Sequence, residues 1–466
     1  MTRRPQPRNG FVILVSSAAA LGGLIFGYDT AIIADAIAFI TAHFHLSTGA
    51  SGFVVSCVLL GAIAGAAVAG PLSEAFGRRK VLFATAALFA LGAAGSAAAA
   101  TSGELVAARI VCGLAIGMAG LLAPVYIAEV APARWRGGLV STYQLAIGLG
   151  QLLAYCIGEA VLKLGSHASQ TTTEWRWMLG IGVVPAMLFF GLLLFITESP
   201  RWLEKQGHTD EAVAVLRRAN GEEQVVEREL DGIRTAIAES SGSWRELLAP
   251  GVRMTLIIGI VITFLQQWAG INAITYYAPK IFQSSGASLH SSFLDTVFLG
   301  LVNVAFTAVA LLLMDRVGRR PLLIGGTAVM TVILAAVGWA FDSGNSNSVL
   351  VLALILAYMA VFMATIGSGM WVLLSEIFPT RMRGPAMAIA TISLWAADYM
   401  VSQLFPSFLK DWGGGVTFWI FGGGSLLLFG FITAFVPETR YRTLEQIEAD
   451  FRAGGLLRRA AGAHGS

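Results

Sequence analysis

The pattern E-x-x-P-x-R-x-R-G occurs twice in this chain, at residues 129–137 and 376–384, each time at the charged end of a long apolar segment. Two further pairs of short motifs recur at nearly the same separation. They are Phe76–Arg79 with Val317–Arg320, and Glu198–Ser199 with Glu438–Thr439. The three separations are 247, 241 and 240 residues. Repetition at one offset predicts that the chain folds as two similar halves.

The apolar segments indicate that both halves are membrane bundles. Hydrophobic residues make up 56% and charged residues 13% of the 466 residues, against about 25% charged residues in a soluble domain. A helix needs about 20 apolar residues to cross a bilayer. We expect twelve such helices, which begin near Phe11, Ser51, Val81, Leu105, Leu139, Trp177, Met254, Ser291, Leu322, Val349, Ala386 and Val416.

The predicted fold is therefore an all-α membrane protein with twelve transmembrane helices in two pseudo-symmetric six-helix bundles. The bundles are predicted at 1–197 and 251–437, with an intracellular helical linker at 198–250 and a cytoplasmic tail at 438–466. Apolar residues at helical spacing predict two or three short amphipathic helices in the linker. Val213, Leu216, Leu230 and Ile233 provide apolar faces that can dock under the bundle.

The basic residues predict the orientation. If both termini are cytoplasmic, the inside loops and tails hold 26 of the 31 Lys and Arg residues. Positive residues resist translocation, so we expect a multi-pass protein of the inner cell membrane with both termini in the cytoplasm. Because these residues are spread over many short loops, the expected partner is the lipid bilayer and no nucleic acid.

Several classes of chemistry are not expected. The sequence has no phosphate-binding loop G-x-x-x-x-G-K-[ST], no H-E-x-x-H motif and no nucleophile elbow G-x-S-x-G, which argues against ATP-driven transport and against an enzyme. The three cysteines lie in apolar segments without metal-ligand spacing. We therefore expect no catalytic residues, no metal and no cofactor, and any energy for transport must come from a gradient.

Charged residues inside spans are costly and mark function. Asp29 in the first span and Arg109 in the fourth lie at similar depth. An aspartate beside an arginine stays ionised, and its protonation frees the arginine, so the pair can act as a proton switch. The alternative is a static pair that locks two helices. We expect Asp35 and Glu159 to be solvated at the outer interface, whereas Asp398 either lines a cavity or caps a helix break.

Uncharged polar groups in the spans predict the cargo. Amides both donate and accept hydrogen bonds, which suits sugar hydroxyls, and an indole face packs on the C–H face of a pyranose. The candidates are Gln144 and Gln151 on one helical face of the fifth span, Gln266, Gln267, Asn272 and Tyr276 around an expected break in the seventh, and Asn303 and Trp371. Hydrogen bonding between helices is the alternative use of such amides.

The repeated motifs lie at the predicted cytoplasmic ends, which favours control of access over substrate binding. We expect the carboxylates of Glu129 and Glu376 to bridge arginines when the inner side is closed. The arginines are Arg78, Arg136, Arg319 and Arg383. The alternative is that the motif arginines only determine topology, but this leaves the recurring Glu, Pro and Gly unexplained.

Together these motifs resemble the sugar porter family of the major facilitator superfamily, closest to bacterial proton-coupled symporters of xylose, glucose, galactose and arabinose. Further residues that carry the resemblance are Gly27–Thr30, Glu198–Leu203, Gln266–Asn272 and Pro437–Arg440. The resemblance implies the major facilitator fold, a monosaccharide bound by the amides, Tyr276 and Trp371 above, and proton coupling by Asp29 and Arg109.

The chain also departs from the family pattern. Leu394–Trp395 replaces the Gln–Trp of xylose symporters, so the resemblance implies a sugar contact at Trp395 with one hydroxyl contact missing. Glu74–Ala75 replaces Asp–Arg in the first Gly-Arg-Arg loop, which predicts a looser first gate. The predicted function is proton-coupled monosaccharide symport by alternating access in a monomer. A proton-independent facilitator and a sugar sensor are the alternatives, and the sequence leaves the preferred sugar open.

Overall fold

The computed structural model describes residues 9–132, 135–165, 173–239, 250–343, 348–378 and 382–439. Regular structure within these ranges is helical throughout. The helices of the first half are α1 (Asn9–His43), α2 (Thr48–Phe76), α3 (Arg78–Ala98), α4 (Ser102–Val130), α5 (Arg136–Leu164), α6 (Glu174–Gly180) and α7 (Val183–Leu193). The second half contains α11 (Pro250–Trp268), α12 (Ile271–Ser284), α13 (Leu289–Val317), α14 (Arg319–Asp342), α15 (Ser348–Phe362), a π-helical turn η2 (Met363–Gly367), α16 (Ser368–Ile377), α17 (Arg383–Asp411) and α18 (Gly413–Phe435).

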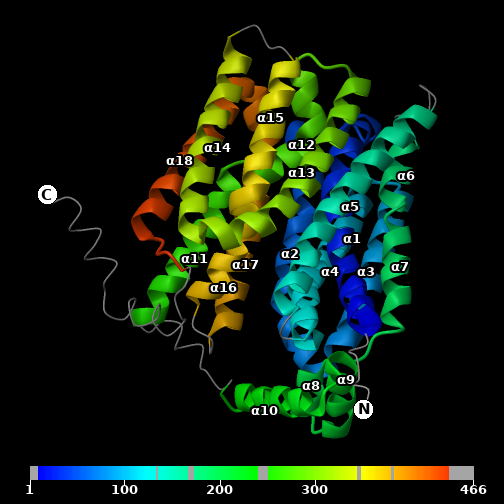
Figure 1. Cartoon of the computed structure of the whole chain (residues 1–466). Helices are drawn as coiled ribbons and strands as arrows, with labels where there is room; N and C mark the ends of the chain where they lie inside the picture. The colour runs from blue at the N-terminus through cyan, green and yellow to red at the C-terminus, as the bar shows by residue number, and fades with distance from the viewer. Residues whose placement is uncertain are drawn as a thin grey trace, which may run out of the picture. The chain divides into compact units, whose positions relative to one another are not determined.

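These helices occupy all twelve predicted spans, since α6–α7, α11–α12 and α15–η2–α16 each fill one span (Figure 1). Eleven of the spans in the described ranges are long and apolar enough to cross a membrane by length and composition. The twelfth, α17, is outside that set although it has 29 residues. Polar residues such as Asp398 and Gln403 lower its hydropathy. Asp398 belongs to a group of hydrogen-bonded polar residues that is described below.

The chain forms two compact units. Unit 1 contains residues 1–29, 60–150 and 179–242, and unit 2 contains residues 30–59, 151–178 and 243–466. In the following, the motif end of a helix is the end that carries the repeated motifs or lies beside them. The opposite ends of α1, α2 and α5 thus belong to unit 2, together with the helices of the second half. The predicted domain boundaries at 197, 250 and 437 stay predictions.

Small residues bring α2 and α4 into backbone contact within unit 1. A Cβ at Gly61 would lie 2.2 Å from the Ile110 carbonyl oxygen, and one at Gly65 would lie 2.1 Å from that of Leu114. From α4, a Cβ at Gly117 would lie 2.1 Å from the Ala62 oxygen. Such close approach increases dispersion contact where lipid provides no hydrophobic driving force between helices. The large apolar side chains that remain exposed, such as Leu91 and Val332, suit contact with lipid tails.

The predicted break in the seventh span is confirmed. Gly270 has a left-handed φ of +88° between α11 and α12, and Tyr277 leaves the helical region with φ −127° and ψ 18°, two residues before Pro279. A Cβ at Gly270 would lie 2.6 Å from Phe421, so both conformation and space require glycine there. The Tyr358 hydroxyl donates to the Ala269 carbonyl at 2.6 Å and satisfies backbone left over at the break.

Three short helices follow the first bundle, as predicted for the linker. They are α8 (Pro200–Lys205), α9 (Thr209–Asn220) and α10 (Glu223–Glu239). Ser199 caps α8 by accepting from the Trp202 amide at 3.3 Å, with Pro200 at the first helical position. The four predicted docking residues instead pack with Val226 in a cluster of their own. Helices α8 and α9 contact α4.

Candidate functional site

A half-buried carboxylate, that of Glu198, caps α3 at the motif end of unit 1. Glu198 Oε1 accepts from the Arg78 amide at 2.9 Å, and its two oxygens accept from the Arg79 amide at 3.2 and 3.1 Å. Gly77, directly before α3, has φ +98° and ψ 153°, and a Cβ there would lie 2.4 Å from Glu198 Oε2. Glycine therefore lets the carboxylate reach the orphan N–H groups of the first helical turn, where the helix dipole favours negative charge.

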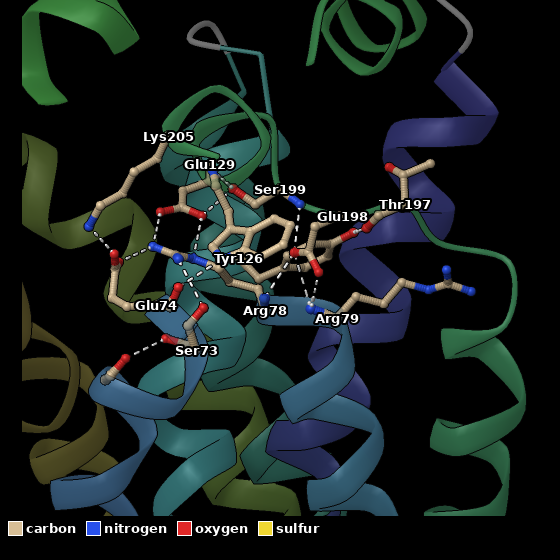
Figure 2. A network of polar contacts seen from close by, with 12 residues as sticks. Ser73, Glu74, Arg78, Arg79, Tyr126, Glu129, Thr197, Glu198, Ser199 and Lys205 are labelled. Carbon is tan, nitrogen blue, oxygen red and sulfur yellow. Dashed lines mark hydrogen bonds and ion pairs between the residues drawn. The ribbon is translucent and has the colours of Figure 1, made fainter. Parts of the chain in front are cut away.

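The Arg78 side chain links this cap to the E-x-x-P motif (Figure 2). Its Nε and Nη2 donate to the two carboxylate oxygens of Glu129 at 3.1 and 3.2 Å. The Ser199 hydroxyl donates to the same carboxylate at 2.5 Å. Arg78 is 5% exposed, so the bidentate pair is shielded from water and from salt.

Glu74 extends this cluster. It accepts from Arg78 Nη2 at 2.7 Å, forms an ion pair with Lys205 of α8, and its backbone carbonyl accepts from Trp202 Nε1 at 2.9 Å. Glu74, at the position that departs from the family pattern, thus ties α2 to α8 through its ion pair with Lys205. The predicted looser gate stays a prediction.

Unit 2 contains the same arrangement, built from the second copy of each motif. Glu438 accepts from the Arg319 and Arg320 amides at 3.3 and 3.2 Å, behind Gly318 with φ +101° and ψ 156°. Arg319 Nη2 lies 3.0 Å from Glu376, whose carboxylate also accepts from the Thr439 hydroxyl at 2.5 Å. The cap, the arginine pair and the hydroxyl donor therefore recur residue for residue.

The expected bridges of Glu129 and Glu376 are present to Arg78 and Arg319, each inside its own unit. The Arg136 side chain lies outside the described residues. Arg383 forms no ion pair with the side chains that the structure describes, and its Nε has no hydrogen-bond partner among them. The gating role of all six residues stays a prediction.

Burial raises the pKa of the Glu198 carboxyl, while the amide donors of Ser199, Arg79 and Arg78 and the Arg78 charge oppose that rise. The net direction shows that desolvation outweighs the cap at this position. Protonation of Glu198 would weaken its hydrogen bonds to the first turn of α3, so the cap is sensitive to pH.

The structure brings Asp29 and Arg109 together in unit 1. Arg109 Nη2 donates to Asp29 Oδ2 at 3.4 Å between α1 and α4. Their side chains are 6% and 1% exposed for Asp29 and Arg109 respectively. Both charges are thus inside the helix bundle, where an ion pair is retained only when each partner compensates the other. Their coupling role stays a prediction.

A second buried carboxylate, Asp398 of α17, organises polar groups around the break in the seventh span. Asn272 Nδ2 donates to Asp398 Oδ2 at 2.7 Å, and the Tyr276 hydroxyl donates to the same oxygen at 3.1 Å. The Ser402 hydroxyl donates to Oδ1 at 3.0 Å. Asn272 also donates to Gln267 Oε1 at 3.0 Å. Two predicted sugar contacts, Asn272 and Tyr276, thus bond to one aspartate, and a third, Gln267, is linked to it through Asn272.

The remaining predicted sugar contacts are placed less uniformly. Gln151 of α5 accepts from Asn303 of α13, and Asn303 in turn accepts from the Thr307 hydroxyl at 3.3 Å. Gln266 is buried, and its Oε1 has no hydrogen-bond partner among the described residues. Gln144 and Trp371 are half-buried and Trp395 is buried.

The expectation that Asp35 and Glu159 are solvated is wrong. Asp35 is fully buried and Glu159 is 6% exposed. Asp35 packs directly against Gly158 of α5, and hydropathy alone cannot predict such a contact between helices. Their surroundings are described in a later section.

Comparison with known proteins identifies the family. The family model described as "Sugar (and other) transporter" matches residues 15–451. The arabinose-proton symporter of Bacillus subtilis is 43% identical over 94% of this chain and 95% of its own length. The chain belongs to the sugar transporter family.

Solved structures agree with this assignment. The xylose transporter XylE of Escherichia coli, in a partially occluded inward-open conformation, matches with a TM-score of 0.84 at 34% identity, over 93% of this chain and 100% of that one. The proton:xylose symporter XylE bound to 6-bromo-6-deoxy-D-glucose matches with a TM-score of 0.82 at 36% identity, over 95% and 99%. The chain is therefore a multi-pass membrane transporter with the major facilitator fold, and not an enzyme.

Sequence reasoning about this transporter missed two features of the site. The first is the capping role of Glu198 and Glu438, although their recurrence at the motif offset was the available signal. The second is the hydrogen bonding of Asp398 to Asn272 and Tyr276, two of the predicted sugar contacts. A charge in the middle of a span was the signal there, but the sequence does not reveal which neighbours it meets.

Proposed function

We propose that this transporter is a proton-coupled monosaccharide symporter that works by alternating access. A proton binds at Asp29, and the sugar binds to the polar groups around Asp398, Gln151 and Asn303. The names of its relatives support the substrate class and the coupling: an arabinose-proton symporter, and a proton:xylose symporter solved with a halogenated glucose.

The observation that carries proton coupling is the buried pair of Asp29 and Arg109. While Asp29 is ionised, the pair holds α1 to α4 by charge. A proton on Asp29 neutralises the carboxylate and leaves Arg109 free to interact elsewhere, which changes the attraction between the two helices. Proton binding and helix packing are therefore linked at one atom, Asp29 Oδ2.

The polar groups of unit 2 suit a polyhydroxylated ligand. A sugar hydroxyl donates and accepts at once. It can accept from the amides of Gln151, Gln266 and Gln267, and it can donate to Gln266 Oε1, which has no donor among the described residues. Trp371 and Trp395 offer indole faces for the C–H side of a pyranose. Asp398 would orient Asn272 and Tyr276 toward the same ligand.

We further propose that the motif ends face the cytoplasm, as does each terminus, because positive residues concentrate there. The two motif clusters would then brace each half on the inner side during alternation. A monomer suffices for this mechanism, since each proposed ligand contact comes from one chain.

The test is uptake of D-xylose, L-arabinose and D-glucose into proteoliposomes, with and without an inward proton gradient. A gradient of about one pH unit supplies about 1.4 kcal/mol, so one-to-one coupling accumulates sugar about tenfold. We expect Asp29→Asn to abolish accumulation but retain sugar exchange, and Asp210→Asn on exposed α9 to behave as wild type. Wild-type uptake that only equilibrates would identify a facilitator, and absence of uptake would refute the substrate class.

A further inference from the structure

Asp35, in the part of α1 that belongs to unit 2, is completely buried, and neither of its carboxylate oxygens has a hydrogen-bond partner among the described residues. Its side chain fills the space left by a glycine on α5. A Cβ at Gly158 would lie 1.9 Å from Asp35 Oδ2 and 2.7 Å from Cγ. The carboxyl group therefore points directly at the α5 backbone, and this packing requires Gly158.

The neighbouring groups do not compensate a charge on Asp35. Glu159 directly follows Gly158 on α5 and is itself a carboxylate, so it adds negative charge beside Asp35. The hydroxyl of Tyr155, one turn earlier, donates a hydrogen bond to the Thr275 carbonyl at 3.0 Å. Lys163 Nζ and His290 Nε2 lie 3.0 and 3.7 Å from Glu159 Oε1. The Lys163 ammonium and the His290 imidazole thus both contact Glu159.

An ionised Asp35 would be expensive in this position. A buried carboxylate without a donor or a cation costs several kcal/mol, and a second carboxylate beside it increases the cost. Two neighbouring carboxylates resolve such a conflict by keeping a proton on one of them. Because Glu159 has a cationic partner in Lys163 and Asp35 has none among the described residues, the proton belongs on Asp35. The described residues hold no cluster of three or more metal-ligating side chains.

The pair lies where the two sequence halves meet inside unit 2. Phe39 of α1 contacts Phe293 of α13, with ring centroids 6.2 Å apart. A Cβ at Gly300 of α13 would lie 3.0 Å from Leu152 of α5. His290, which contacts Glu159, is the second residue of α13. A movement of α13 away from α5 would therefore remove the His290 imidazole from Glu159 and expose the neighbourhood of Asp35 to water.

We propose that Asp35 is a second proton-binding site, distinct from Asp29, that holds its proton while α5 and α13 are in contact. Separation of these helices hydrates Asp35 and allows proton exchange with the medium at the opposite end. The link to transport rests on the symport proposed above, whereas the bound proton itself does not.

The test is infrared spectroscopy of the purified full-length protein during pH titration. A protonated carboxyl has a carbonyl stretching band that an ionised one lacks. We expect such a band at neutral pH, absent in Asp35→Asn and retained in Asp29→Asn and Asp210→Asn. Glu159→Gln should shift the loss of the band to lower pH, because it removes the neighbouring negative charge. No band in wild type, or the same band in Asp35→Asn, would overturn the proposal.

Thermal unfolding in detergent adds a second measurement. Asn has the shape of a protonated aspartic acid, so Asp35→Asn should keep the wild-type Tm at neutral pH. Destabilisation of this variant, or a rise in the wild-type Tm with sodium that Asp35→Asn abolishes, would replace the proton with a bound cation. Neither measurement needs uptake, so failure of the proposed symport and failure of this site can be told apart.

Discussion

Gly77→Ala is expected to disrupt the cap of α3 for two reasons, backbone strain and a steric clash. The φ of +98° and ψ of 153° at Gly77 lie in a region that is almost confined to glycine, and a side chain there costs about 1–3 kcal/mol. The new Cβ would also lie 2.4 Å from Glu198 Oε2, so the carboxylate must move. Loss of one charge-assisted bond, such as the one at 3.1 Å to the Arg79 amide, costs about 1.5–3 kcal/mol. Together the two effects give about 4 kcal/mol.

The measurement is the apparent Tm of the detergent-purified protein, read from the fraction that stays monodisperse after heating. Gly70→Ala is the matched control, because Gly70 lies in α2 seven residues earlier, in helical conformation, with nothing within 4 Å of a new Cβ. We expect a clear drop in Tm for Gly77→Ala and a Tm at or above wild type for Gly70→Ala. Equal values for Gly77→Ala and wild type would refute the cap as a stabilising element.

The two motif carboxylates should differ in their effect on stability. Glu129→Gln should lower the free energy of unfolding by about 3 kcal/mol, because the side chains of Glu129 and Arg78 are only 10% and 6% exposed. Glu376→Gln should lower it by about 1 kcal/mol, because Glu376 and Arg319 are 26% and 16% exposed. Equal losses of Tm would contradict this ranking. Asp398→Asn should raise the KM for sugar uptake about tenfold, because Asn272 loses a charged acceptor worth about 1.5 kcal/mol, and an unchanged KM would remove Asp398 from the site. Burial raises the pKa of Glu198 above its usual 4.5, so between 4.5 and the raised pKa the folded protein binds more protons than the unfolded chain. Stability therefore falls as the pH rises through this window. Glu198→Gln should flatten this dependence of the Tm on pH.

Hydropathy and the repeated motifs were sufficient to predict the helices, because lipid leaves the backbone few alternatives. The break at Gly270 was also predictable, since Asn272, the two tyrosines and Pro279 interrupt the apolar pattern there. The meeting of Asp29 with Arg109 followed from matching depth on antiparallel helices. In each case the feature depends on the local sequence pattern or on the depth of a residue in the membrane, and both can be read from the sequence.

Lateral neighbours were harder to predict. Depth placed Asp35 near the interface, but whether water reaches it depends on Gly158 of another helix, and no local pattern encodes that contact. The same limit applies to Asp398, two of whose three donors come from another helix, α12. For the motif glutamates, the sequence predicted an arginine partner but not which one. The pairing of Glu376 with Arg319 depends on how α14 packs against α16.

The ion pairs of each motif cluster lie within one unit, and this affects the kinetics of transport. Inside unit 2, apart from the exposed His290 beside Glu159, the two sequence halves are joined by hydrogen bonds between uncharged groups. Examples are Ser56 to Gln403 at 2.7 Å and Tyr155 to the Thr275 carbonyl at 3.0 Å. Each such bond contributes about 1 kcal/mol and is insensitive to screening by ions. Separation of the halves at this seam would therefore have a low barrier, and its rate would change little with ionic strength.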